Sequence, residues 1–215
     1  MGFDLLPLLQ EKKIIAIIRG VEEKDIEPIA HALIDGGIKF LEITMDTKGA
    51  LEAVCRLKET YGDRIKIGVG TVLNVDMAKE AVQAGAEFIV SPYLNENVIK
   101  YCVKQNTPVW PGTMTPTEIY RAYELGAKAV KIFPSGTLGA RYIKEIKSPL
   151  NHVQMIVTGG INLENVSSYL KNGAIAVGVG GNLVDKHLVK QRDFSALQKR
   201  AEMFVERVKE VTQDE

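Results

Sequence analysis

Residues 122–134 read Ala-Tyr-Glu-Leu-Gly-Ala-Lys-Ala-Val-Lys-Ile-Phe-Pro, a helical segment that ends at Gly126 followed by a short apolar strand that ends at Pro134. Glycine adopts the left-handed conformation that often ends a helix, and proline cannot continue the pairing of a strand. The same unit of amphipathic helix, glycine and apolar strand recurs three more times, with its glycines at Gly36, Gly85 and Gly173. The chain therefore repeats one helix-to-strand module.

Four further apolar strands lie between these modules, at residues 14–18, 66–70, 109–110 and 155–157. Short apolar strands that alternate with amphipathic helices are typical of parallel strands joined by helical crossovers. Eight such strands predict one closed (β/α)8 barrel, a TIM barrel of the α/β class, as a single domain over residues 1–215. A short N-terminal helix and a C-terminal helix over 194–211 complete it. An open doubly wound sheet is less favoured, because Arg19-Gly20 replaces the Gly-x-Gly-x-x-Gly turn after the first strand.

Composition restricts the function classes. Apolar residues make up 46% of the chain and charged residues 25%, which is the balance of a globular domain with a sizeable core. The 27 Lys and Arg residues match the 27 Asp and Glu residues, so no charge excess favours nucleic acid or an anionic membrane. No stretch is long and apolar enough to span a bilayer. Cys55 and Cys102 lack metal-ligand spacing, and we interpret both as small core residues in a reducing cytoplasm.

Lys131 is the most unusual residue of the chain, because an ammonium in a short apolar strand loses much of its hydration. Its stem could lie along apolar surface with its head in water, or its amine could form a Schiff base with a carbonyl compound. In residues 41–44 the alternation turns Glu42 and Thr44 into the barrel, and the same parity turns Ala129, Lys131 and Phe133 inward. Reactive groups of such barrels collect at the carboxyl ends of the strands. Glu42 and Lys131 are therefore predicted to share one mouth.

Two interpretations of this carboxylate and amine remain open. A buried ion pair without chemistry is one, although such pairs seldom stabilise a fold more than apolar residues of similar volume. Catalysis is the other, since Schiff-base formation needs an unprotonated amine and a group that shuttles protons. The glycine turns 158–160 and 178–181 precede helices on the last two strands, where barrels often bind phosphate through backbone amides.

Five segments, at 41–44, 68–74, 89–92, 130–134 and 158–161, together resemble the 2-keto-3-deoxy-6-phosphogluconate (KDPG) and 4-hydroxy-2-oxoglutarate (KHG) aldolase family. The match runs in order along nearly the whole chain. The resemblance implies a class I aldolase on a (β/α)8 barrel, without metal or other cofactor, that cleaves small 2-keto-4-hydroxy acids to pyruvate and an aldehyde. It also implies a homotrimer; cysteine usage and charge balance add the expectation of a cytoplasmic protein with no nucleic-acid or membrane partner.

Position by position, the resemblance makes Lys131 the Schiff-base lysine and Glu42 the group that transfers protons. It gives substrate-binding roles to a further set of residues: Arg19, Thr71 and Pro92 at the substrate carboxylate, Phe133 beside the lysine, and Thr158, Gly159, Gly160, Gly180 and Gly181 at a phosphate. Two positions depart from the family pattern. Asp46 stands where some members have arginine, and it repels an anionic substrate group. Gly181, followed by Asn182, stands where many members have a serine that binds phosphate, so phosphorylation of the aldehyde half and its C4 stereochemistry stay open.

Three other functions compete with the aldolase. A sugar-phosphate isomerase or epimerase on the same barrel would use Glu42 as its base. A non-catalytic effector-binding barrel would make Asp46 and Gly181 traces of a lost activity. A metal-assisted aldolase is disfavoured, because the three histidines are widely spaced and form no pattern of two histidines and a carboxylate: His31, His152 and His187.

Overall fold

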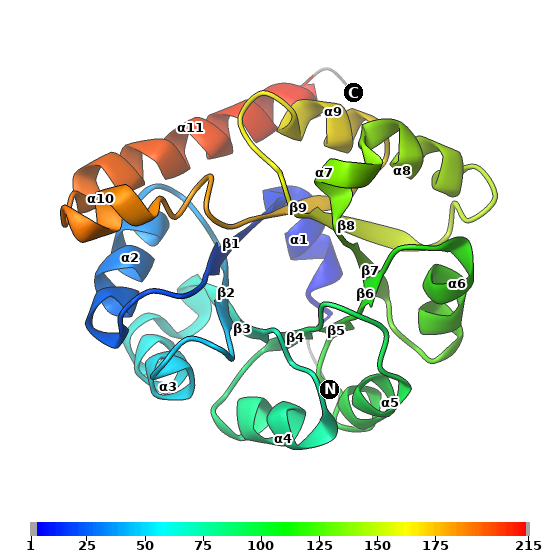
Figure 1. Cartoon of the computed structure of the whole chain (residues 1–215), viewed down its shortest axis with the longest axis horizontal. Helices are drawn as coiled ribbons and strands as arrows, with labels where there is room; N and C mark the ends of the chain where they lie inside the picture. The colour runs from blue at the N-terminus through cyan, green and yellow to red at the C-terminus, as the bar shows by residue number, and fades with distance from the viewer. Residues whose placement is uncertain (1–3, 214–215) are drawn as a thin grey trace.

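The computed structural model describes residues 4–213, and its strands form a ring surrounded by helices (Figure 1). The strands are β1 (Ile14–Ile18), β2 (Phe40–Thr44), β3 (Lys66–Gly70), β4 (Phe88–Val90), β5 (Val109–Trp110), β6 (Gly112–Thr113), β7 (Ala129–Ile132), β8 (Gln154–Thr158) and β9 (Ala176–Val179). The helices are α1 (Leu6–Lys12), α2 (Glu23–Asp35), α3 (Ala50–Tyr61), α4 (Val75–Gln83), α5 (Glu96–Lys104), α6 (Pro116–Glu124), α7 (Ser135–Leu138), α8 (Ala140–Lys147), α9 (Val166–Lys171), α10 (Lys186–Lys190) and α11 (Phe194–Gln213), with a 3-10 turn η1 (Gly62–Arg64).

All strand pairs are parallel, in the order β5-β4-β3-β2-β1-β9-β8-β7-β6. The two ends of this order are one stretch of chain, since only Pro111 separates β5 from β6. Trp110 pairs with Val90 on β4, whereas Gly112 pairs with Lys131 on β7. Proline has no N–H to donate, so the ladder breaks there. The predicted barrel of eight strands is confirmed, with its fifth strand divided at Pro111.

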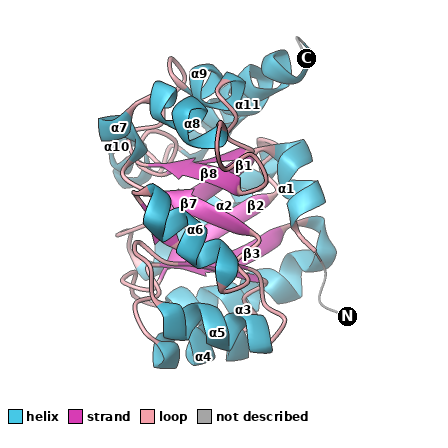
Figure 2. Ribbon diagram, turned by 90° about the vertical axis from the view of Figure 1, so that its right-hand side faces the viewer, coloured by secondary structure: helices cyan, strands magenta, loops and turns pink. Residues whose placement is uncertain are grey.

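Alternation along the strands separates two apolar cores. Outward-facing residues such as Leu41, Ile43 and Val130 pack under the helices. Inward-facing residues fill one end of the barrel, and this inner cluster comprises Leu5, Leu9, Ile15, Phe40, Phe88, Val90, Trp110, Ala129, Ile156 and Ala176. The Phe88 and Trp110 rings stack with centroids 4.4 Å apart. Leu9 belongs to α1 and Leu5 immediately precedes it. Because both residues are part of the inner cluster, α1 closes this end of the barrel (Figures 1 and 2).

Two glycines of β3 leave room inside the barrel for side chains of neighbouring strands. A Cβ at Gly68 would lie 2.2 Å from the Phe88 ring, and a Cβ at Gly70 would lie 1.8 Å from Oε1 of Glu42. Real Cβ atoms essentially never come within 3.0 Å of another heavy atom. The sequence Lys-Ile-Gly-Val-Gly of β3 therefore makes room for the aromatic core and for the Glu42 carboxyl.

Two predictions from the sequence are wrong in detail. Gly36 has φ −75°, and the left-handed residue after α2 is Gly37 with φ 92°. Position 36 is restricted by packing instead, because a Cβ there would lie 2.5 Å from Cβ of Ala201 on α11. Cys102 is buried as expected, but Cys55 is exposed, with its thiol donating to the Ala84 carbonyl.

The C-terminal helix α11 begins at Phe194 as predicted and packs mainly against α2 and α9. Its apolar line of Leu197, Ala201, Phe204 and Val208 is buried in the outer core. Within residues 4–213, no helix combines the length and apolar character needed to cross a membrane.

Candidate active site

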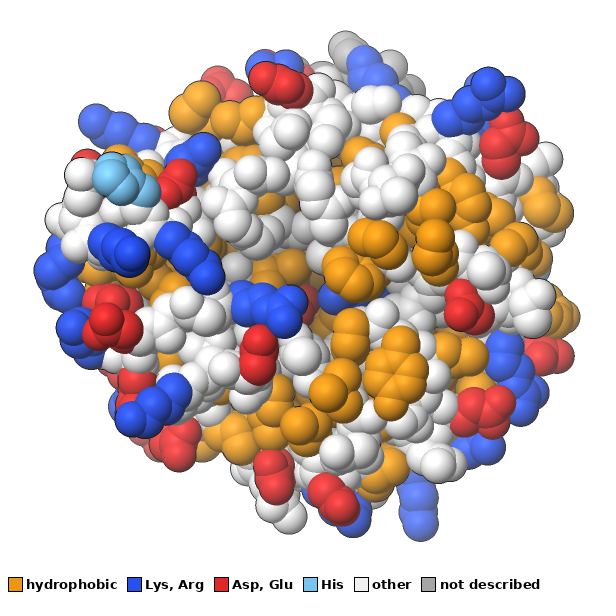
Figure 3. Space-filling model, in the orientation of Figure 1, with side chains coloured by type: hydrophobic (Ala, Val, Ile, Leu, Met, Phe, Trp, Pro, Cys, Tyr) orange, Lys and Arg blue, Asp and Glu red, His pale blue; other side chains and the backbone are white. Residues whose placement is uncertain are grey.

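A cavity of about 650 Å³ opens at the carboxyl ends of the strands. All eleven residues predicted to form the site line it: Arg19, Glu42, Thr71, Pro92, Lys131, Phe133, Thr158, Gly159, Gly160, Gly180 and Gly181. Figure 3 looks onto this face and shows a hollow near its centre, with basic and acidic side chains at its rim. The structure therefore brings together residues from the ends of seven barrel strands.

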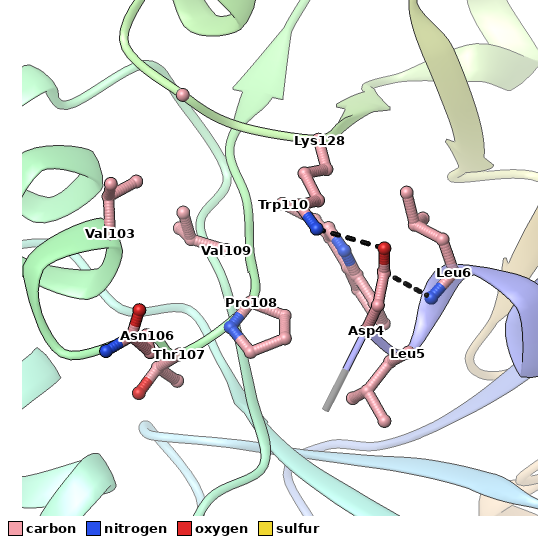
Figure 4. Close-up of a pocket in the computed structure, with 11 residues that line it drawn as sticks. Asp4, Leu5, Leu6, Val103, Asn106, Thr107, Pro108, Val109, Trp110 and Lys128 are labelled. Atoms are coloured by element: carbon pink, nitrogen blue, oxygen red, sulfur yellow. Dashed lines mark hydrogen bonds and ion pairs between the residues drawn. The ribbon is translucent and has the colours of Figure 1, made fainter. Parts of the chain in front are cut away.

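A smaller cavity of about 200 Å³ lies beside α1 and β5, near the amino ends of the strands (Figure 4). Its charged residues contact each other, since Asp4 pairs with Lys128 at 2.9 Å and accepts a hydrogen bond from the Leu6 amide at 3.1 Å. Trp110 also lines this cavity, but it is only 2% exposed and belongs to the inner apolar cluster. None of the predicted site residues lines this cavity.

Lys131 lies on β7 between Gly112 of β6 and Ile156 of β8, and only 7% of the residue is exposed. Its backbone N–H donates to the Pro111 carbonyl at 2.9 Å, which fixes the strand beside the break. Its Nζ lies 5.0 Å from the centroid of the Phe133 ring. The side chain therefore ends inside the cavity against an aromatic wall, and the interpretation with its head in bulk water is wrong.

Glu42 lies on β2 between Ile17 of β1 and Gly68 of β3, and only 3% of it is exposed. Burial raises the pKa of its carboxyl, and the charges of Lys131 and Arg19 offset only part of that effect. Four places separate β2 from β7 in the ring of eight strands, so the two side chains face each other across the barrel axis. Among residues 4–213 neither side chain has a hydrogen bond or an ion pair within 4.0 Å. The buried ion pair, one of the two interpretations that the sequence left open, does not form, and both side chains line the cavity.

Arg19 and Asp46 form an ion pair at the mouth of the cavity. Nε and Nη2 of Arg19 lie 3.2 and 3.1 Å from Oδ2 of Asp46. Burial raises the pKa of the Asp46 carboxyl, but the hydrogen bond from Thr44 and the charge of Arg19 outweigh it, and the net shift is downward. Asp46, which was expected to repel an anionic substrate group, thus pairs with the guanidinium of Arg19.

The loop that carries Asp46 is tied to the end of β1. The Gly20 amide donates to Oγ1 of Thr47 at 3.0 Å, and Oγ1 of Thr47 lies 3.1 Å from Oγ1 of Thr44. Thr44, which the alternation of the strand turns into the barrel, is buried in this hydrogen-bond chain and does not line the cavity. Thr71, after the neighbouring strand β3, also lines the cavity; it has φ 57°, a left-handed conformation that is uncommon for a β-branched residue.

The loops after β8 and β9 present backbone amides to the cavity. Gly159 and Gly160 have φ 95° and 76°, which suits glycine. The amides of Gly160, Ile161, Gly181 and Asn182 have no acceptor among residues 4–213. The Asn182 side chain donates to the Ile161 carbonyl at 2.8 Å, so it joins the two loops. Such free amides form a cradle suited to an anion.

Several residues that line the cavity were not among the eleven predicted site residues, although Gly178 begins the predicted glycine turn 178–181. Lys186 lies at its rim, and Gly178 belongs to its floor, where a Cβ would lie 2.5 Å from Oγ1 of Thr158. Gly70 escaped notice because its role, space for Glu42, depends on which strands are neighbours. The described residues contain no group of three or more His, Cys, Asp or Glu side chains placed to hold a metal ion.

Comparison with known proteins identifies the family. The model of the KDPG and KHG aldolase family matches residues 7–200. The chain is 35% identical over 188 residues to the 2-dehydro-3-deoxy-phosphogluconate aldolase of Treponema pallidum, covering 87% of this chain and 89% of the relative. It is also 35% identical to the 2-dehydro-3-deoxy-6-phosphogalactonate aldolase of Escherichia coli, covering 79% of this chain and 83% of that one.

Among solved structures, a KDPG aldolase from Legionella pneumophila, with pyruvate captured as a covalent carbinolamine intermediate, superposes with a TM-score of 0.87. It shares 29% identity and covers 94% of this chain and 98% of its own. A structure described as native KDPGal superposes equally well, at 31% identity, over 93% of this chain and 96% of its own. As the motifs predicted, the chain belongs to the KDPG and KHG aldolase family, whose named members are carbon–carbon lyases.

Proposed function

We propose that this protein is a class I aldolase that cleaves 2-keto-4-hydroxy acids to pyruvate and an aldehyde through a Schiff base on Lys131. The observation that carries the proposal is the placement of a buried amine and a buried carboxyl on opposite strands of one cavity, with no ion pair between them. An internal ion pair would explain burial, but it would not leave both groups open to a ligand. The carbinolamine of the Legionella pneumophila relative supports the same chemistry.

In the first half of the reaction, Nζ of Lys131 in its neutral form attacks the C2 ketone. The resulting carbinolamine loses its hydroxyl as water when a proton arrives from Glu42. Because burial raises the pKa of Glu42, its carboxyl retains a proton at pH values where a surface glutamate has lost it. The product is an iminium, with the proton donor converted to a carboxylate facing it.

In the second half, the Glu42 carboxylate accepts the proton of the C4 hydroxyl, directly or through a water. The C3–C4 bond breaks, its electron pair moves into the iminium, and the aldehyde leaves. The remaining enamine of pyruvate is protonated at C3 and hydrolysed, which returns the Lys131 amine. One carboxyl thus serves as acid and then as base in the same turnover.

The remaining residues bind the substrate in this proposal. Arg19, Thr71 and Pro92 position the carboxylate of the keto acid, and Phe133 restricts the lysine. The amides and small side chains of the last two strands hold the far end of the substrate: Thr158, Gly159, Gly160, Gly180 and Gly181. These roles rest on the shared cavity and on the free amides after β8 and β9.

Reductive trapping tests the proposal. Protein incubated with pyruvate and borohydride is expected to gain the mass of one reduced adduct, and peptide mapping is expected to place it on Lys131. Lys131→Met should take no label and have no activity, whereas Lys190→Met, which removes an exposed lysine outside the cavity, should be labelled like the wild type. An unlabelled wild-type protein with isomerase or epimerase activity would instead establish the competing function.

We also infer that the protein is a cytoplasmic homotrimer of single-domain chains. Three exposed apolar residues support the assembly, because Leu73, Tyr93 and Met114 lie on successive loops after β3, β4 and β6. Figure 3 shows apolar side chains gathered beside the hollow on this face. Sedimentation should give three times 23.7 kDa, and Tyr93→Glu should reduce the mass to one chain. Met203→Glu, at an exposed position of α11, is the matched control.

A further inference from the structure

Three basic side chains line the active-site cavity: Arg19, Lys131 and Lys186. Lys131 is buried at its floor, and Arg19 is paired with Asp46 at 3.1 Å. Lys186 has no acidic side chain within 4.0 Å among the residues that the structure describes. Lys131 is proposed to react with the substrate and Arg19 is neutralised by a carboxylate, so Lys186 is the basic residue of the three that is left to bind another anion.

The surroundings of Lys186 direct it into the cavity mouth. Asp185, its neighbour, accepts from the His187 amide at 2.8 Å and pairs with Arg200 at 3.0 Å, so its charge is engaged elsewhere. The Lys186 amine lies on the other side, 3.4 Å from where a Cβ on Gly20 would stand. It therefore reaches from the segment after β9 to the loop after the neighbouring strand β1, at the edge of the opening.

Free backbone amides lie on the same side of the cavity. Gly181 and Asn182 precede Lys186 in the loop after β9, and Asn182 ties that loop to Ile161 after β8. The amides of Gly181, Asn182 and Ile161 have no acceptor among residues 4–213. A charged amine beside several free N–H groups matches a phosphoryl or carboxylate group, which accepts hydrogen bonds on every oxygen.

We propose that Lys186 is a specificity-determining residue that binds an anionic group at the far end of the aldehyde half of the substrate. The inference rests on the proposed aldolase function, because that function fixes one end of the substrate at Lys131. A chain bonded to the buried lysine extends toward the exposed rim, where Lys186 and the free amides lie. Lys186 supplies a positive charge at this rim, whereas the charge of Arg19 is neutralised by Asp46.

The anion could be a phosphoryl ester or a carboxylate, and three substrates separate these sources. They are 2-keto-3-deoxy-6-phosphogluconate, 4-hydroxy-2-oxoglutarate and unphosphorylated 2-keto-3-deoxygluconate, whose far end is neutral. For Lys186→Met, kcat/KM is expected to fall about 10- to 100-fold on the anionic substrate that the residue binds, which is typical of a lost hydrogen bond to a charged group. On the neutral substrate it should change less than about twofold. Lys186→Arg should restore most of the loss.

Lys190→Met is the matched control, because it removes the same charge from the same short helix outside the cavity. An equal loss on all three substrates, no loss on any, or an equal effect of Lys190→Met would overturn the inference. Borohydride trapping of pyruvate runs in parallel on both variants. Normal trapping without substrate discrimination refutes only the role of Lys186, whereas a wild-type protein that never traps pyruvate refutes the aldolase and this inference together.

Discussion

Gly70→Ala tests whether the position of the Glu42 carboxyl controls catalysis. The new Cβ would stand 1.8 Å from Oε1 of Glu42, so the oxygen must move by at least about 1.2 Å to reach a tolerable contact. Gly70 has no left-handed φ, so alanine brings no backbone strain there. Displacing a catalytic group by about 1 Å costs about 10²-fold in rate. We therefore expect kcat to fall about 100-fold, with pyruvate trapping on Lys131 slowed but still detectable.

Gly68→Ala is the control, because it crowds the same strand and the same face two residues away. Its Cβ would meet the Phe88 ring at 2.2 Å, in the apolar part of the barrel. Overpacking of a core costs about 1–3 kcal/mol, which lowers Tm by about 2–12 °C in a chain of this length. Both variants should lose stability in this range, but Gly68→Ala should retain kcat within about threefold.

A second substitution makes the test specific. Glu42→Asp shortens the side chain by one methylene and withdraws the carboxyl from position 70, so it should harm Gly70→Ala less than it harms the wild type. Turnover and thermal unfolding would be measured for the four proteins of this cycle. If folded Gly70→Ala keeps wild-type kcat, or if Gly68→Ala loses as much, the geometric reasoning about Glu42 fails.

Three further predictions concern charge and space in the cavity. Asp46→Asn removes the carboxylate that pairs with Arg19, so KM for anionic substrates should fall several-fold and should depend more strongly on salt concentration. A KM that is unchanged, with an unchanged dependence on salt concentration, would contradict this. At Gly181 a Cβ would meet nothing within 4 Å, so Gly181→Ser should fold normally and raise the preference for phosphorylated substrate about tenfold, measured as a ratio of kcat/KM. Glu42→Gln should raise Tm at pH 7–8, because the wild-type carboxyl, with its raised pKa, loses native stability as pH rises from 4.5 through that raised pKa. The gain should vanish below pH 4.5, where both side chains are uncharged; a gain independent of pH would be evidence against the raised pKa.

Much of the site could be predicted because it depends on local periodicity. The period of two along residues 40–44 and 129–133 placed Glu42 and Lys131 on the inner face, and the count of strands placed them at one mouth. The structure shows both side chains there, on opposite strands. Nothing more than strand parity and closure of the barrel was needed for that result.

The details that the sequence missed depend on neighbours that are distant along the chain. Gly70 matters because β3 lies beside β2, and Gly36 matters because α11 returns across α2. The ion pair of Arg19 with Asp46 joins two loops that the sequence separates by 27 positions. Lys186 looked like an ordinary surface residue, since only the fold of its loop turns it toward Gly20. The sequence pattern shows which face of a helix or strand a residue lies on, but not which other element packs against that face.

The two ends of the barrel interior divide stability from chemistry on the same strands. Phe40, Ala129 and Ile156 fill the closed end, and two residues further along their strands stand Glu42, Lys131 and Thr158. The lower layer, at the closed end, packs large rings against one another. The upper layer, which contains Glu42, Lys131 and Thr158, has glycine in place of larger side chains at positions 70 and 178. Burial of an unpaired amine and carboxyl destabilises the fold, so the lower layer must compensate for it. Substitutions that enlarge the upper layer should therefore reduce activity before they unfold the protein, and those that shrink the lower layer should unfold it first.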